Sequence, residues 1–153
     1  METLPGLLAE HPFLAGLKPD HFPFLLEAAS QVKYPAGQIL FQEGGEADRF
    51  ILVHRGQVVL ETFVPGRGQI TIQTVGSGEA LGWSWLFPPY RWHFSARVNE
   101  PTDAIVFDAR RLRTTAAEHC GFGYDLVTRV AQVVLQRLQA TRLQLLDFYD
   151  VHD

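Results

Sequence analysis

A stretch punctuated by glycines occupies residues 34–61 of the chain: YPAGQILFQEGGEADRFILVHRGQVVLE. Its apolar runs are short and rich in β-branched and aromatic residues, which favours strands over helices. Turn residues gather at Gly37, at Gly44 and Gly45, and at Gly56, where glycine allows the chain to reverse. The strands expected from this pattern are 39–41, 50–54 and 57–64. Because the turns recur about every 8–12 residues, the stretch predicts a β-sandwich or barrel.

The same two-residue period continues towards the C-terminus. We expect a strand over residues 69–75 and two further strands over 94–98 and 104–107, which Asn99-Glu-Pro101 separates. Towards the N-terminus, apolar residues recur at helical spacing over residues 12–30, so short helices are expected there. The β region is therefore expected to span residues 31–108.

Helical spacing returns after Asp108, which is a candidate N-cap for a short helix over 109–118. A longer helix is expected to follow and to end near Tyr149, so that C-terminal helices span 109–150. Its apolar residues advance in steps of three and four, which is typical of helices that pair with a second copy. The dimer stripe expected from this spacing, which begins after Tyr124, is Val127, Ala131, Val134, Leu138, Thr141, Leu145 and Phe148.

The stretch at 34–61 resembles the front half of a cyclic nucleotide-binding domain. The resemblance rests on Gly37 three residues after an aromatic residue, on Glu43-Gly44, on Asp48 and on Gly56. It implies a mainly β fold, an antiparallel β-roll of the jelly-roll kind with N-terminal helices and a long C-terminal helix, as one domain over residues 1–153. Sensor domains of bacterial regulators of the catabolite-activator type have this fold. No helix-turn-helix follows the long helix, so a stand-alone module is expected.

A second stretch, residues 76–98, holds all three tryptophans: GSGEALGWSWLFPPYRWHFSARV. Turn glycines, aromatic rings and a few polar groups are the composition of a small-molecule pocket, although aromatic residues also fill ordinary cores. The resemblance implies that this stretch, here called the cassette, binds the phosphate of a cyclic nucleotide and starts with a Gly-Glu pair. The residues expected to contact a ligand are Gly78, Glu79, Ala80, Leu81, Gly82, Trp83, Arg91, Trp92, His93 and Phe94.

The cassette departs from the family pattern at its arginine. That position falls on Trp92, and Arg91 is one residue out of phase, which in a strand places it on the opposite face unless a bulge restores the phase. Burying a phosphate without a paired cation is costly, so we expect an effector other than cAMP or cGMP. The residues Leu81-Gly-Trp83 resemble sensor domains whose pockets bind another ligand, often aromatic or apolar, or are filled.

An anionic group on such an effector would meet Arg91, His93 or Arg97, although Arg97 also fits an exposed strand position. The formal net charge of -4 and the sequence pI near 5.8 disfavour nucleic acid as a partner. Three arginines on the long helix are interpreted as its solvated face or as donors to interchain ion pairs; they are Arg129, Arg137 and Arg142.

No apolar run reaches about 18 residues, and the N-terminus lacks the pattern of a signal peptide. A cytoplasmic protein without a membrane partner is therefore expected. The six histidines are scattered, so we expect no metal, no cofactor and no enzyme activity. A metal-dependent enzyme of the cupin type remains a third and weaker interpretation.

One main hypothesis and two alternatives follow from the sequence. The main hypothesis is a cytoplasmic sensor that binds a small effector, dimerises through the long helix and is read by a partner protein. The alternatives are a cAMP- or cGMP-binding protein with a modified cassette, and a ligand-free dimeric scaffold.

Overall fold

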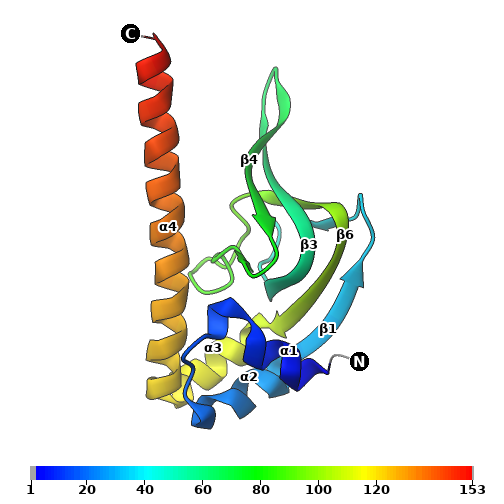
Figure 1. Ribbon diagram of the computed structural model, residues 1–153, viewed down its shortest axis with the longest axis vertical. Coiled ribbons are helices and arrows are strands. Elements are labelled where there is room, and N and C mark those ends of the chain that lie inside the picture. The colour runs from blue at the N-terminus through cyan, green and yellow to red at the C-terminus, as the bar shows by residue number, and fades with distance from the viewer. Residues whose placement is uncertain (1–2, 153) are drawn as a thin grey trace.

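A computed structural model describes residues 3–152 and has the expected architecture (Figure 1). Its described strands form a six-stranded antiparallel sheet with the order β1-β6-β3-β4, in which β2 also pairs with β6 and β5 with β3. The strands are β1 (Ala29–Tyr34), β2 (Ile39–Phe41), β3 (Arg49–Val64), β4 (Gly68–Gly76), β5 (Ala80–Leu81) and β6 (Ser95–Asp108). The predicted antiparallel β-roll with flanking helices is confirmed.

Helices lie before and after the roll. They are α1 (Leu4–Glu10), the 3-10 helices η1 (Pro12–Leu14) and η2 (Pro19–His21), α2 (Phe22–Ala28), α3 (Ala109–Glu118) and α4 (Cys120–His152). Helix α3 has the predicted bounds, and the Asp108 side chain accepts a hydrogen bond from the Arg111 backbone N–H at 3.2 Å. The prediction missed α1, because Pro5 and Gly6 weaken a helical pattern even though proline is tolerated in a first turn.

The predicted turn at Arg55-Gly56 and the predicted break at Asn99-Glu-Pro101 are both wrong. Each lies inside one long strand, β3 or β6, and the two strands bend together with shifts in their register. Gly56 has a φ of +114°, and a Cβ atom there would lie 2.6 Å from the Pro101 carbonyl oxygen. Glycine is needed at this position because the strands cross closely, so a residue typical of turns marks a corner within a continuous sheet.

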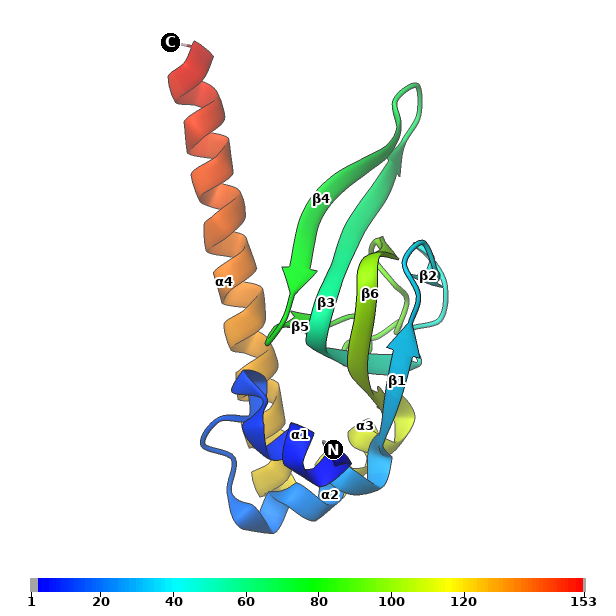
Figure 2. The same cartoon turned by 45° about the vertical axis from the view of Figure 1, so that its right-hand side comes forward.

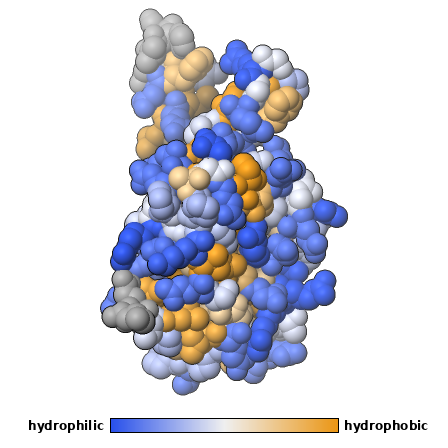
Figure 3. All heavy atoms as spheres, turned by 90° about the vertical axis from the view of Figure 1, so that its right-hand side faces the viewer, coloured by the Kyte–Doolittle hydropathy of each residue, from blue (hydrophilic) through white to orange (hydrophobic). Residues whose placement is uncertain are grey.

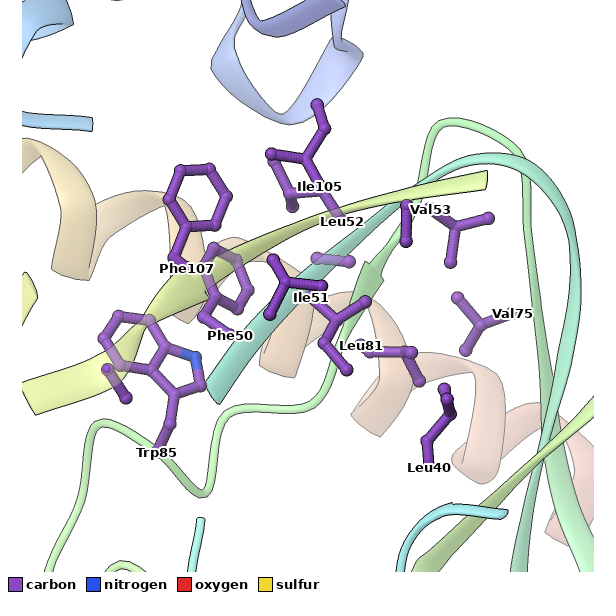
Figure 4. Close-up of a cluster of buried hydrophobic side chains, with 14 of the residues drawn as sticks. Leu40, Phe50, Ile51, Leu52, Val53, Val75, Leu81, Trp85, Ile105 and Phe107 are labelled. Carbon is purple, nitrogen blue, oxygen red and sulfur yellow. The ribbon is translucent and has the colours of Figure 1, made fainter. Parts of the chain in front are cut away.

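The core fills the inside of the roll (Figure 4). Leu52, Val53 and Ile105 come from β3 and β6, and Phe50 and Phe107 stack with ring centroids 5.6 Å apart. Trp85, from the cassette, lies on the other side of Phe50 at 4.8 Å. The cassette is therefore anchored in the same apolar core as the central strands.

Helix α4 is longer than the part of the roll that it covers (Figures 1 and 2). Phe122, Leu126 and Val130 on its N-terminal part are buried in the core, and the Phe122 ring packs on His21 and Phe24 of the N-terminal helices. The helix continues three residues beyond the predicted end at Tyr149. No helix in the described part of the chain combines the length and apolar content needed to cross a membrane.

Candidate functional site

The cassette leaves the sheet after β5 and returns to it at β6. Strand β5 pairs with β3 at Ile51 and Leu52, and Gly82 follows with a φ of +72°. A Cβ atom at Gly82 would lie 3.3 Å from the Phe94 ring, so both the backbone conformation and the available space favour glycine. This turn directs the following residues across the inside of the roll.

Trp92 occupies the inside of the roll at the position where the family resemblance places an arginine. Its side chain is 2% exposed, and its ring stacks on Phe41 with centroids 3.6 Å apart and planes 10° from parallel. Phe94 is also buried, and Trp83 contacts its ring edge-on at 5.9 Å. The cassette therefore presents aromatic surface to the interior at this position.

Arg91 does not share that interior. Burial alternates without interruption from Arg91, which is exposed, to Val98, which is buried. The backbone of Trp92 bonds with that of Gly45 and Gly44 at 2.9 and 2.8 Å on either side, and Arg91 forms a β-bridge with Glu46. The alternation continues through Trp92 without a bulge, so the Arg91 side chain stays on the outer face.

His93 and Arg97 also belong to the outer face, and each has a partner. The Nδ1 atom of His93 lies 2.7 Å from the Oγ atom of Ser84, whose side chain is buried. The Nε atom of Arg97 donates to Glu61 at 3.1 Å. Within residues 3–152, no three His, Cys, Asp or Glu side chains are arranged to hold a metal ion.

Glu79 lies in the turn that precedes β5. Its Oε1 atom accepts a hydrogen bond from the Gly76 backbone N–H at 2.9 Å. The peptide groups of Gly78 and Glu79 bond to both sides of Val53, each at 2.9 Å. The carboxylate is thus held at the surface of the roll, where it faces helix α4.

A groove of about 560 Å³ separates this turn from helix α4. Its walls come from η1, β4, the turn before β5 and α4, and Figure 2 shows how these elements are arranged around the cassette. We call it the α4 groove. Its lining residues with polar side chains are Gln73, Glu79, Arg129, Gln132, Gln136 and Arg137.

Arg137 reaches from α4 to the cassette. Its Nη2 atom donates to the Ala80 carbonyl at 2.6 Å, and its guanidinium lies 5.2 Å from the centre of the Trp83 ring. The Nη1 atom is buried without a hydrogen-bond partner. Burial lowers the pKa of Arg137 to about 10, and the charge of Glu79 opposes part of this shift. The guanidinium therefore remains a cation at neutral pH.

Arg129 ties α4 to the N-terminal segment. It pairs with Asp125 at 2.9 Å and donates to the carbonyls of Phe13 and Ala15 at 2.8 and 2.7 Å. The interpretation of Arg129 and Arg137 as solvated or interchain groups is wrong, because both bind their own chain: Arg129 bonds to the N-terminal segment and Arg137 to the cassette. Arg142, one turn further on, is exposed.

His11 supports the groove wall formed by η1. It is 3% exposed, its Nε2 atom lies 2.9 Å from the Val53 carbonyl oxygen, and its Nδ1 atom accepts from the Phe13 N–H at 3.2 Å. Burial lowers its pKa below the usual 6.5, with a smaller contribution of the same sign from His54, while the bond to Val53 acts in the opposite direction. A neutral imidazole satisfies both bonds.

A family model for the cyclic nucleotide-binding domain matches residues 31–119, which is more than half of the chain. The chain belongs to this family. It is 24% identical over 147 residues to the CRP-like cAMP-activated global transcriptional regulator of Mycobacterium tuberculosis, an alignment that covers 95% of this chain and 64% of the regulator. A cAMP-dependent protein kinase regulatory subunit of Emericella nidulans is 34% identical over 61 residues, which are 40% of this chain and 14% of that subunit. Both relatives are regulators by name.

Solved structures of other cyclic nucleotide-binding domains have the same fold. A domain from Methylobacillus flagellatus aligns with a TM-score of 0.81 and 22% identity, over 94% of this chain and 83% of that one. A candidate cyclic nucleotide-binding protein from Geobacter metallireducens aligns with a TM-score of 0.79 and 28% identity, over 90% of this chain and 99% of that one. The catabolite activator protein of Thermus thermophilus aligns with a TM-score of 0.70 and 23% identity, over 91% of this chain and 63% of that one.

In this cyclic nucleotide-binding domain, the predicted ligand residues fall into three places. Gly78, Glu79 and Ala80 line the α4 groove. Leu81, Gly82, Trp92 and Phe94 are buried, and Trp83 lies half-buried between the two regions. Arg91 and His93 are exposed on the outer face. The predicted contacts with a ligand stay a prediction for each of them.

Sequence reasoning missed the two arginines that hold the cassette from outside. Arg113, on α3, donates to the Trp85 carbonyl at 2.6 Å and lies 4.0 Å from the centre of the Tyr90 ring. At the other end of the cassette, Arg137 likewise donates to a backbone carbonyl, that of Ala80, and lies near an aromatic ring, that of Trp83. A signal for Arg137 exists, because it continues the series of the buried Leu126 and Val130 and the partly buried Val133 in steps of four and three.

Proposed function

We propose that this domain is a regulatory sensor that binds a small effector other than cAMP or cGMP and signals through a dimer of α4. It works in the cytoplasm, and a partner protein reads the state of the helix. The observation that carries the proposal is Trp92, which stacks on Phe41 inside the roll where the family resemblance calls for a cation. An uncompensated phosphate in such a place would cost several kcal/mol.

The α4 groove supports an effector site outside that filled interior. At about 560 Å³ it has the size of an ordinary ligand pocket. Its wall joins the cassette residues Glu79 and Ala80 to Gln136 and Arg137 of α4. An effector that binds differently to two positions of α4 would shift the balance between those positions.

The outer face of α4 supports dimerisation. Val127, Leu138, Leu145 and Phe148 of the predicted stripe are 42%, 64%, 55% and 58% exposed, as expected of an apolar seam that a second helix covers. Val134, in the same stripe, also packs partly against the roll. The distal part of α4 and the β3–β4 hairpin stand as separate projections in Figure 3, each with orange apolar atoms among polar ones.

The two alternatives from the sequence have clear signatures. A modified cassette that binds cAMP or cGMP would need a cation, and Arg91 is the nearest in sequence to the missing one. A ligand-free scaffold would dimerise through α4 without responding to any small molecule. Both use the same fold, so only binding measurements separate them from the proposed sensor.

Calorimetric titration of the purified chain with cAMP and cGMP tests the proposal directly. We expect no saturable heat with either nucleotide. A thermal-shift screen of aromatic acids and small polar metabolites should then give at least one compound that raises Tm. Sedimentation should give a dimer.

The opposite outcomes are equally specific. Tight, saturable uptake of cAMP or cGMP that is lost in Arg91→Ala would establish the modified cassette instead. A dimer whose Tm responds to no compound in the screen would favour the scaffold. The matched control is Arg110→Ala, which removes an exposed arginine from α3.

A further inference from the structure

Two of the charged side chains that line the α4 groove, Arg137 and Glu79, act on each other through their charges. Arg137 lies on the helix side and Glu79 on the roll side, and Glu79 acts on the Arg137 guanidinium through its charge. Within residues 3–152, however, Arg137 and Glu79 do not form a direct ion pair with each other. Opposite charges that face one groove without direct contact leave room for a ligand between them.

The Arg137 side of the groove favours an anionic group. One guanidinium nitrogen is bonded to Ala80, but the buried Nη1 atom has no partner. Leaving a buried donor unsatisfied costs about 1–3 kcal/mol, and more for a charged group. A carboxylate fits the planar fork of a guanidinium and would supply the missing acceptor.

The Glu79 side of the groove argues against a ligand that is only anionic. Its carboxylate already accepts from Gly76, but a carboxylate has about four acceptor positions. A simple anion on Arg137 would be repelled by Glu79, and a simple cation on Glu79 would be repelled by Arg137. A ligand that carries both a negative and a positive group can pair with Arg137 and Glu79 at the same time.

The remaining polar groups of the groove add no uncompensated charge. The charge of Arg129 is balanced by Asp125, and its Nη1 atom donates to Phe13 and Ala15. Three glutamines, Gln73, Gln132 and Gln136, complete the polar lining. Each amide both donates and accepts hydrogen bonds, which suits a polar ligand without adding charge.

We propose that the α4 groove binds a small zwitterion of the size of an amino acid or dipeptide, with its carboxylate on Arg137 and its ammonium group on Glu79. This inference rests on the proposed sensor function and names the class of its effector. Because Arg137 belongs to α4 and Glu79 to the roll, the zwitterion bridges the two parts whose relative position the sensor reports.

The test screens the full chain by thermal shift against pools of the twenty standard L-amino acids and of dipeptides. At least one zwitterion is expected to raise Tm. Its deaminated and decarboxylated analogues, which keep only the acid or only the amine, should bind roughly 10–100-fold more weakly, as expected from the loss of one charged hydrogen bond.

Two variants locate the charges. Arg137→Gln and Glu79→Gln should each weaken binding of the same compound by roughly 10–100-fold. Arg142→Gln and Glu118→Gln are matched controls at exposed positions and should bind as the unmodified chain does. Arg137→Lys keeps the charge, so partial recovery of affinity there excludes a mere folding defect. Binding should also shift the fluorescence of Trp83, and Trp83→Phe should remove that shift.

Several results would overturn the inference. They are the absence of any binder in both pools, equal binding of the acid-only analogue, and unchanged affinity in Glu79→Gln. In the last two cases a small effector still binds, so the proposed sensor stands while its zwitterionic ligand does not. Tight binding of cAMP or cGMP would remove both proposals together.

Discussion

The inner and outer sides of the cassette face very different surroundings. On the inner side, Trp92 and Trp85 are at most 2% exposed and stack on Phe41 and Phe50. On the outer side, the same segment contributes Glu79 and Ala80 to an open groove with both polar and apolar lining, which Arg137 completes. One stretch of chain thus supplies both a dry core and one wall of an open groove.

The largest expected effect concerns the inner side. Trp92→Ala should lower the free energy of unfolding by about 3–5 kcal/mol, because it removes a stacked ring and leaves a cavity. Chemical denaturation measures the loss, and added indole should restore part of Tm by filling the space. Trp83→Ala, at a half-buried site, should cost clearly less. A loss below about 1 kcal/mol for Trp92→Ala would mean that the interior is loosely packed.

A smaller effect is expected at the junction of the two sides. Arg137→Met keeps most of the apolar stem but removes the bond to Ala80 and the contact with Trp83, so stability should fall by about 1–2 kcal/mol. Arg142→Met on the exposed helix should change stability by less than about 0.5 kcal/mol. Equal effects of the two substitutions would contradict a bridge between α4 and the cassette.

His11, which supports the η1 wall of the α4 groove, should make the free energy of unfolding depend on pH. The pKa of His11 is lowered by burial, so the unfolded chain binds a proton more readily than the folded one. The stability contributed by neutral His11 is full above pH 6.5 and is lost as pH falls through the lower folded pKa, with a slope of at most about 1.4 kcal/mol per pH unit.

Thermal unfolding between pH 7 and pH 5 measures that slope. His11→Gln should flatten it, since glutamine does not titrate. His152→Gln is the control, because it removes a histidine from the far end of the chain. An unchanged slope in His11→Gln would assign the pH dependence to other groups.

The smallest effect on a single folded chain belongs to the far side of α4. Leu138→Glu should change the stability of one protomer by less than about 0.5 kcal/mol, because the side chain is 64% exposed. It should nevertheless convert the predicted dimer to a monomer in sedimentation experiments, since a charge would enter an apolar seam. Leu143→Glu, on the same helix but outside the stripe and 63% exposed, should remain dimeric. A dimer that survives Leu138→Glu would place the interface elsewhere.

Local patterns in the sequence predicted a sandwich or barrel and most of the flanking helices, whereas the β-roll itself was implied by the family resemblance. Asp108 caps α3 as its position implied, because a cap depends on residues within one turn. Gly56 was misread because glycine favours turns and strand corners equally, and only the approach of Pro101 distinguishes them. That approach involves residues far apart in sequence.

The site was less predictable than the fold. The change of phase at Trp92 was visible in the sequence, and the alternating burial through this residue agrees with it. The role of Arg137 was not recognised despite its spacing from Val133, because an arginine on an amphipathic helix usually faces solvent. Its direction depends on how the buried series of α4 docks on the roll, which is a tertiary property.

The corner at Gly56 also decides where foreign sequence can be introduced. β3 and β6 pass this corner as unbroken strands with almost no space between Gly56 and Pro101, so a peptide spliced there would separate paired backbones along both strands. The hairpin tip at Pro65, Gly66 and Arg67 is exposed and belongs to neither strand, and such tips accept insertions readily. A reporter protein built into this domain therefore belongs at the tip, where it would stand clear of the roll.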